Sequence, residues 1–128
     1  MLLLSGLDEF SEKGARATVE LRKDNPFLRP DGLLERVAYV EFMAQCFAAG
    51  AGALARRMET PPAAWGYLAA LRDITVHADA RLGETLAVSV ALVAALGPVT
   101  VLDGEVRSAN TLLATGQFKV FIPEKERG

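Results

Sequence analysis

Residues 37–55 read VAYVEFMAQCFAAGAGALA, and this stretch decides the fold because it is the most apolar part of the chain. Its length and composition predict a buried helix that ends near Arg56 and Arg57, where basic side chains suit the helix dipole. Asp31 is the expected N-cap. Glu41 is the only formal charge in the stretch. Burial of this side chain would favour its protonated form, as a general acid requires, beside a channel that admits an apolar substrate.

The surroundings of Glu41 support two alternatives to a catalytic role. The apolar run approaches the length that spans a bilayer, but a carboxylate at its centre costs about 2.5–3.5 kcal/mol on insertion scales. Gln45 follows Glu41 by one helical turn and adds a second polar group to the same face. We therefore expect no membrane span. The other alternative is a structural ion pair in the core, with Arg36 or Arg72 as the partner of Glu41.

Composition narrows the class of protein. The chain has 128 residues, 23% of them charged, and a net charge of −2, which predicts one globular domain over residues 1–128 and no nucleic-acid partner. A single cysteine, Cys46, excludes an internal disulfide and suits the cytoplasm. It falls on the helix as core filler, while His77 is expected to face solvent beside Asp73 and Thr75. One His and one Cys provide no zinc-ligand set, and no metal or other cofactor is expected.

Sequence patterns typical of β-strands occur both before and after the predicted helix. Residues 15–22 alternate apolar and polar side chains and follow a short apolar segment, which predicts a hairpin. The segment after it, 23–32, contains two prolines and a glycine and is expected to be a loop. After the helix the expected strands cover residues 65–76, 85–96, 99–108 and 112–122.

One helix among six strands limits the architecture. A doubly wound sheet needs helices on both faces, so the sheet must instead curl around the single helix. The small residues of the helix, such as Ala48 and Gly50, let strands approach it closely. The predicted class is α+β, an antiparallel sheet wrapped around one long central helix, which is the hotdog fold.

Within this framework nearly the whole chain resembles the β-hydroxyacyl-ACP dehydratases and their hotdog relatives. It is most similar to the small dehydratase-like proteins of aryl-polyene and other polyketide-type lipid pathways. The helix motif Glu41-Phe42-Met43-Ala44-Gln45 is the most specific of the matching segments. The others are Met1–Leu4, Asn25–Leu28, Gly66–Asp73, Leu82–Glu84 and Ala114–Phe121.

The resemblance implies a reaction and a set of roles. In this family a 3-hydroxyacyl thioester on a carrier protein loses water, with a loop His as base and a helix carboxylic acid that protonates the departing hydroxyl. By position Glu41 matches the acid and Gln45 the glutamine that holds it. Ala70 falls where a glycine N–H binds the thioester oxygen, the logic of an oxyanion hole. The loop residues Pro26 and Phe27 are expected to contact the substrate.

Asn25 departs from the family pattern, because the relatives in this subgroup begin the loop with His-Pro. An amide has no useful basicity near neutral pH. His77 is no substitute, since it lies on a different strand. Loss of a general base typically costs about 10²–10⁴-fold in rate. The sequence therefore predicts a dehydratase-like protein that is weak or inactive alone.

Three functions remain open at this point. The first is a subunit that completes an active site with a partner, because in this family the loop base comes from one chain of a dimer and the helix acid from the other. The expected assembly is a homodimer, or a heterodimer with a His-bearing hotdog dehydratase, acting on acyl-ACP or acyl-CoA. The second is an acyl-thioester hydrolase, and the third a non-catalytic acyl-binding subunit. Four cations are candidates to receive the acidic phosphopantetheine arm: Arg29, Arg56, Arg57 and Arg72.

Overall fold

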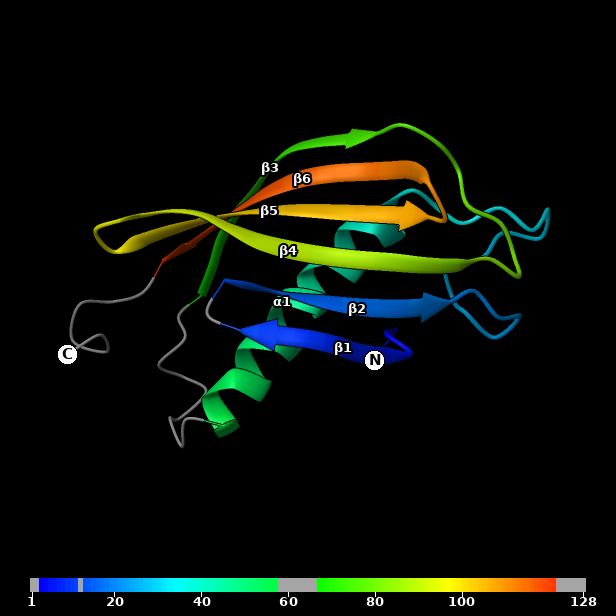
Figure 1. Ribbon diagram of the computed structural model, residues 1–128. Helices are drawn as coiled ribbons and strands as arrows, with labels where there is room; N and C mark the ends of the chain where they lie inside the picture. Colours follow the sequence, from blue (N-terminus) through cyan, green and yellow to red (C-terminus); the bar gives the residue numbers. More distant parts are fainter. Residues whose placement is uncertain (1–2, 12, 58–66, 122–128) are drawn as a thin grey trace.

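The strands and the helix follow one another in the predicted order. A computed structural model describes residues 3–11, 13–57 and 67–121. Its elements are β1 (Gly6–Ser11), β2 (Gly14–Glu20), α1 (Val37–Arg57), β3 (Tyr67–Val76), β4 (Thr85–Leu96), β5 (Val99–Ser108) and β6 (Thr111–Phe121). The strands form one antiparallel sheet in the order β1-β2-β4-β5-β6-β3. The sheet curves over α1, which crosses its inner side (Figure 1). The predicted hotdog architecture is confirmed.

The core lies between α1 and the inner face of the sheet. The helix contributes Tyr39, Phe42, Met43 and Cys46, all fully buried. Alternation in β2 works as predicted, because Ala15, Ala17 and Val19 are buried while the residues between them are more exposed. Burial of these apolar side chains is the main favourable contribution to folding.

Two glycines set how closely the strands approach the helix. A Cβ added to Gly50 of α1 would lie 2.5 Å from the Cβ of Ala15 in β2. A Cβ added to Gly104 of β5 would lie 2.6 Å from Met43 Sδ and 2.7 Å from the ring of Phe118. The expectation that small helix residues admit close strands therefore holds at Gly50, and β5 uses the same device.

The start of the helix differs from the prediction. Asp31 is not its N-cap, because α1 begins at Val37. The Asp31 carboxylate instead accepts a hydrogen bond from Leu33 N at 3.1 Å and pairs with Arg29 at 2.9 Å. Leu33 and Leu34 then form isolated β-bridges, to Arg81 and Leu28, so these two residues are not helical.

The other predicted elements agree closely with the structure. The bounds of β4 and β5 are the predicted ones. β6 begins one residue before its predicted range, and residue 122, the predicted last one, lies outside the described residues. Cys46 is buried, and His77 is exposed together with Asp73 and Thr75, as expected. Residues 65 and 66, at the start of the predicted third strand, lie outside the described residues.

The apolar helix also has to be weighed as a membrane segment. By length and composition, Val37–Leu54 is apolar enough to cross a membrane. The core helix of a folded domain has the same composition, and the inward face of α1 packs against the sheet.

Candidate functional site

Glu41 and Gln45 form a hydrogen-bonded pair on α1. Gln45 Nε2 donates to Glu41 Oε1 at 3.0 Å, one helical turn apart. Gln45 Oε1 accepts a hydrogen bond from the backbone N–H of Leu3 at 2.7 Å. The amide of Gln45 therefore connects the carboxylate to the N-terminal segment. The structure brings these two predicted site residues together.

The expected burial of Glu41 is wrong for the single chain, where its side chain is exposed. One sheet covers only one side of α1, so the opposite stripe stays open. Val37 on this stripe is 61% exposed, and Ala48 is also exposed. We call the stripe formed by Val37, Glu41, Ala44, Gln45 and Ala48 the outer face of α1. Among the described residues, none covers the side chain of Glu41.

The described side chains do not place Glu41 in a structural ion pair. Arg36, one of the two predicted partners, pairs with Asp79 instead, with Arg36 Nε 3.0 Å from Asp79 Oδ1. This pairing lowers the pKa of Asp79, chiefly through the hydrogen bond from the guanidinium. Glu41 forms no ion pair with any arginine whose side chain the structure describes. The other predicted partner is Arg72, whose side chain lies outside the described part of the structure.

The loop that contains Asn25 is fixed by hydrogen bonds of its own. Asn25 Oδ1 accepts from Phe27 N at 2.9 Å, and Asn25 O accepts from Leu28 N at 3.2 Å. This is an Asx turn, in which the side-chain amide replaces a backbone acceptor. Pro26 is exposed at the bend, whereas Phe27 is partly buried against the core. Asn25 is thus a half-buried structural residue of the loop.

A hollow of about 410 Å³ opens beside this loop. Its lining comes from the N-terminal segment, the end of β2 and the loop: Leu3, Leu4, Ser5, Glu20, Arg22, Asp24, Asn25 and Pro26. Leu3 lines this hollow and also donates to Gln45, so the N-terminal segment connects the two predicted parts of the site. Among the described residues, no hydrogen bond joins Asn25 to Glu41. The contacts of Leu3 were not predicted from the sequence, although Met1–Leu4 was one of the segments that resemble the family.

Ala70 lies on β3, at the edge of the sheet. Its backbone pairs with Lys119 of β6, next to a register irregularity between Leu68 and Ala70. On the other side of β3 the structure describes no strand. On an edge strand, alternate backbone N–H groups face away from the sheet and are accessible to a substrate or a partner. The role of Ala70 as a thioester-binding residue stays a prediction.

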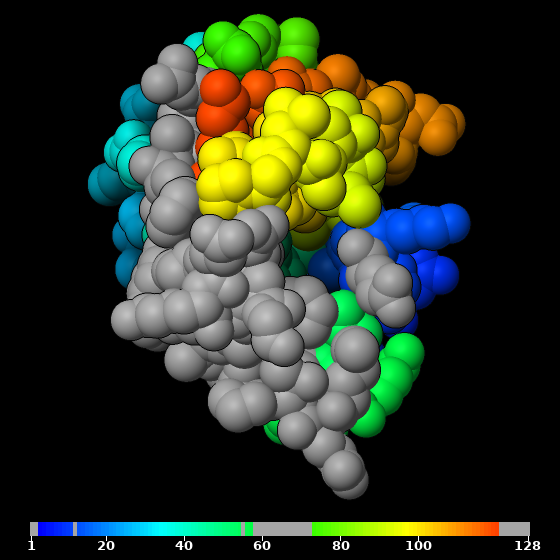
Figure 2. Space-filling model, turned by 90° about the vertical axis from the view of Figure 1, so that its left-hand side faces the viewer, coloured from blue at the N-terminus to red at the C-terminus, as the bar shows by residue number. Residues whose placement is uncertain are grey.

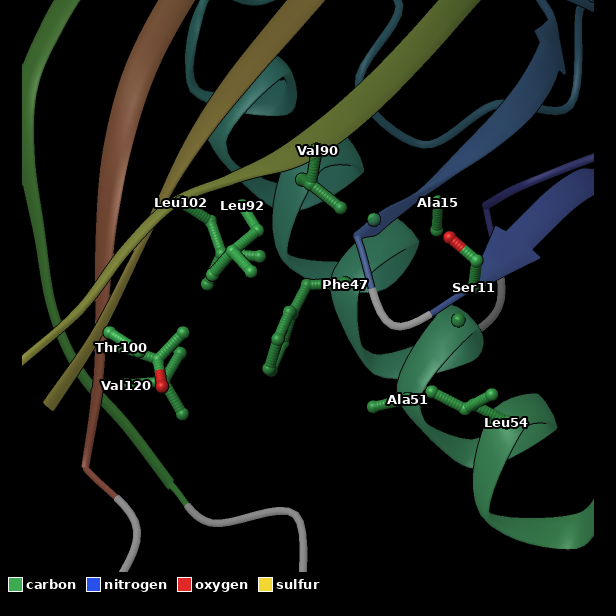
Figure 3. Close-up of a pocket in the computed structure, with 13 residues that line it drawn as sticks. Ser11, Ala15, Phe47, Ala51, Leu54, Val90, Leu92, Thr100, Leu102 and Val120 are labelled. Carbon is green, nitrogen blue, oxygen red and sulfur yellow. The ribbon is translucent and has the colours of Figure 1, made fainter. Parts of the chain in front are cut away.

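An apolar cavity of about 200 Å³ lies between the C-terminal half of α1 and the sheet (Figure 3). Phe47 projects into it from the helix, facing side chains of β4, β5 and β6 that include Leu92, Thr100 and Val120. Neither Glu41 nor Gln45 lines it. The expectation that Glu41 borders an apolar channel is therefore wrong within one chain, because the acid and this cavity belong to different sides of the helix.

Cys46 is not an alternative catalytic group to Glu41. Burial raises the pKa of Cys46 to about 12, so the thiol stays protonated and unreactive near neutral pH.

Among the four candidate cations for the phosphopantetheine arm, Arg29 is paired with Asp31 and Arg57 stacks 4.2 Å from the ring centre of Phe10. Arg56 is exposed, and the side chain of Arg72 lies outside the described part.

Comparisons with known proteins identify a family and several similar folds. The family model described as ApeP-like, ApeP dehydratase, matches residues 1–127. No curated protein gives a match. The dehydratase heterocomplex ApeI:P from Xenorhabdus doucetiae is a similar solved structure, with a TM-score of 0.81 and 24% identity over 97% of this chain and 84% of that chain.

Two further solved structures have the same fold at lower identity. Zebra fish thioesterase superfamily member 2 gives a TM-score of 0.72 and 13% identity over 91% of this chain and 80% of that chain. The smu.793 protein from Streptococcus mutans UA159, bound to acetyl CoA, gives a TM-score of 0.73 and 15% identity over 92% of this chain and 87% of that chain.

Proposed function

The chain belongs to the ApeP-like dehydratase family, and from this premise we propose that it is one half of a 3-hydroxyacyl thioester dehydratase in cytoplasmic fatty-acid or polyketide-type lipid synthesis. The observation that carries the proposal is the Glu41–Gln45 pair on the outer face of α1. A carboxylate held by a hydrogen bond, on a face that the chain itself leaves uncovered, suits an active site that a second chain completes.

The proposed reaction assigns one step to each group. A base removes the proton next to the thioester carbonyl, and charge develops on the carbonyl oxygen, where the backbone N–H of Ala70 is placed by the resemblance. Glu41 then gives its proton to the departing hydroxyl, which leaves as water. Gln45 keeps the Glu41 carboxyl oriented for this transfer.

The base has to come from another chain. Asn25 has no basicity to offer, and its amide oxygen is used in the loop turn. The heterocomplex among the similar structures supports a heterodimer with a His-bearing hotdog dehydratase, and a homodimer would lack the base in both sites. The partner would also cover the outer face of α1, remove Glu41 from water and so favour the protonated acid that the reaction needs.

The test is to mix this protein with a His-bearing dehydratase relative and measure dehydration of a 3-hydroxyacyl carrier protein. We expect the pair to be active and Glu41→Gln to lower the rate by about 10²–10⁴-fold. Glu35→Gln is the matched control, since Glu35 is an exposed carboxylate just before the helix. Equal activity of the Glu41→Gln and wild-type pairs would refute the assignment.

A second function, action on an acyl thioester without dehydration, is supported by the thioesterase among the similar structures and by the apolar cavity. Hydrolysis of acyl-CoA by the purified protein would favour a thioesterase. Acyl-CoA binding without turnover, alone or in the mixture, would favour an acyl-binding subunit. The Asn25→His variant distinguishes these two alternatives from the dehydratase proposal. Dehydration by this variant without a partner would show that the wild-type chain lacks only the base.

A further inference from the structure

The N-terminal segment ahead of β1 holds a fixed place beside α1. Ser5 N donates to Thr18 O at 2.7 Å, and Ser5 Oγ accepts from Glu20 N at 2.8 Å, so two hydrogen bonds fasten the segment to β2. Leu4 is buried and belongs to the core. The strand that follows, β1, lies at the surface next to the C-terminal half of α1, blue beside green (Figure 2). The backbone N–H of Leu3 is therefore a donor with a fixed position.

This N–H decides which end of the Gln45 amide faces Glu41. A side-chain amide has an oxygen that accepts and an NH2 group that donates, and rotation by half a turn exchanges their places. A backbone N–H can only donate, so the amide presents its oxygen to Leu3 N, at 2.7 Å. The NH2 group then points to Glu41 Oε1, at 3.0 Å. The contact with Leu3 thus disfavours the reversed amide.

The direction of the amide determines which oxygen of Glu41 can carry a proton to a substrate. In the observed direction Oε1 accepts from Gln45, so the proton of the neutral acid belongs on Oε2. With the amide reversed, its oxygen would face Glu41, and the neutral acid would donate its proton to Gln45. The reversed amide would therefore withhold the proton from the reaction.

We infer that the backbone N–H of Leu3 is a positioning group for Glu41, which acts through Gln45 and keeps Oε2 available as the proton donor. The inference rests on the proposed dehydratase function. When the proton passes from Oε2 to the departing hydroxyl, the C–O bond breaks and water leaves, while the electrons of the broken C–H bond form the new C=C bond. Leu3 takes no part in these steps and only fixes the geometry in which they start.

Two substitutions at one position separate the N–H of Leu3 from its side chain. Leu3→Pro removes the donor, because proline has no backbone N–H, and Leu3→Ala keeps it. In the complex with a His-bearing dehydratase relative, we expect Leu3→Pro to lower kcat by roughly tenfold, the worth of one hydrogen bond, with little change in KM. Leu3→Ala is expected to keep the wild-type kcat. An equal fall in kcat for both variants would overturn the inference, since the side chain and not the N–H would then be responsible.

A double-mutant cycle tests the route through Gln45. In a Gln45→Leu background, Leu3→Pro is expected to cause no further fall in kcat, because the amide that Leu3 orients is already gone. Falls in kcat that multiply in the double variant would overturn the inference, because Leu3 would then act without Gln45. Circular dichroism of each variant gives the folded fraction to which its rate is referred.

The single chain provides a measurement that needs no activity. NMR follows the exchange of the two Nε2 protons of Gln45 with solvent, and we expect the same exchange rate in wild type and Leu3→Ala but faster exchange in Leu3→Pro. Identical exchange in Leu3→Pro and wild type would overturn the inference. An inactive wild-type pair would refute the proposed function alone, and the exchange rates would then still decide whether Leu3 orients Gln45.

Discussion

At the scale of single residues, Gln45 connects more of the proposed site than any other described side chain. It donates to Glu41 and accepts from the backbone of Leu3. An amide can do both at once because it has a donor group and an acceptor group, which neither Glu nor Leu offers. In the described part of the chain, the Glu41 carboxylate is held by this side chain.

Replacement of Gln45 tests that dependence. Gln45→Leu is expected to lower the free energy of unfolding by about 1 kcal/mol, since the N–H of Leu3 loses its acceptor. Gln45→Glu keeps an acceptor for Leu3 but places a second carboxylate beside Glu41. We expect Gln45→Glu to restore part of the stability and not the activity of the partner complex, measured by urea unfolding and by dehydration rate. Full activity of both variants would exclude a positioning role for Gln45.

Cys46 provides a test of the core that is independent of function. Burial raises the pKa of its thiol to about 12, so in the folded chain the thiol stays protonated up to that range. The unfolded chain loses this proton at a lower pH, and the stabilising contribution is present below the unfolded pKa and lost as pH rises towards about 12. We expect little reaction with a thiol reagent at mildly alkaline pH in the folded state and rapid reaction in urea. Rapid reaction of the folded protein would show that the core is open.

At the scale of elements, the approach of β5 to α1 depends on the absence of a side chain at Gly104. Met43 and Phe118 fill the space that a Cβ would occupy, and both are fully buried. Interiors are close-packed, so neither side chain has room to move without cost.

Gly104→Ala is therefore expected to lower the free energy of unfolding by about 1–3 kcal/mol, the usual cost of overpacking. Gly6→Ala is the control, because a Cβ there meets nothing within 4 Å. Urea denaturation of the two variants measures the difference. Equal midpoints would mean that the core at Gly104 relaxes freely.

At the scale of the whole molecule, one side of α1 is covered by the sheet and the other is not. In a complex with a partner dehydratase we expect the outer face of α1 to be buried. Ala48→Arg would then prevent assembly of the active pair, while the single chain keeps its circular dichroism spectrum and melting temperature. Thr111→Arg, at an exposed position on β6, is the control. Undiminished complex formation by Ala48→Arg in a pull-down or sedimentation experiment would place the partner elsewhere.

The local parts of this fold were predictable from sequence. Alternation in β2 and the Gly97-Pro98 turn defined strands and a hairpin, because both signals act over a few residues. The start of α1 was not predictable in this way. Leu33 bridges to Arg81 and Leu34 N donates to Ala80 O, both distant in the sequence, and these contacts come ahead of the helix. The pairing of Glu41 with Gln45 followed from helical spacing.

The exposure of Glu41 could not be predicted from the sequence, because an apolar helix does not reveal how many of its sides one chain covers. The Asx turn of Asn25 was missed for a different reason. The resemblance draws attention to the base that the loop lacks, whereas the asparagine acts through a hydrogen bond to its own backbone. The first difference concerns surroundings beyond the helix motif, whereas the second is a contact within the loop segment Asn25–Leu28 itself.

The hydrogen bond from Leu3 to Gln45 has a practical consequence for anyone who prepares this protein. A purification tag fused just ahead of Leu3 would sit beside the amide that pairs with Glu41, and the fusion would disturb the proposed site. A tag at the other terminus avoids this contact, and an inactive preparation with an N-terminal fusion would not test the proposed function.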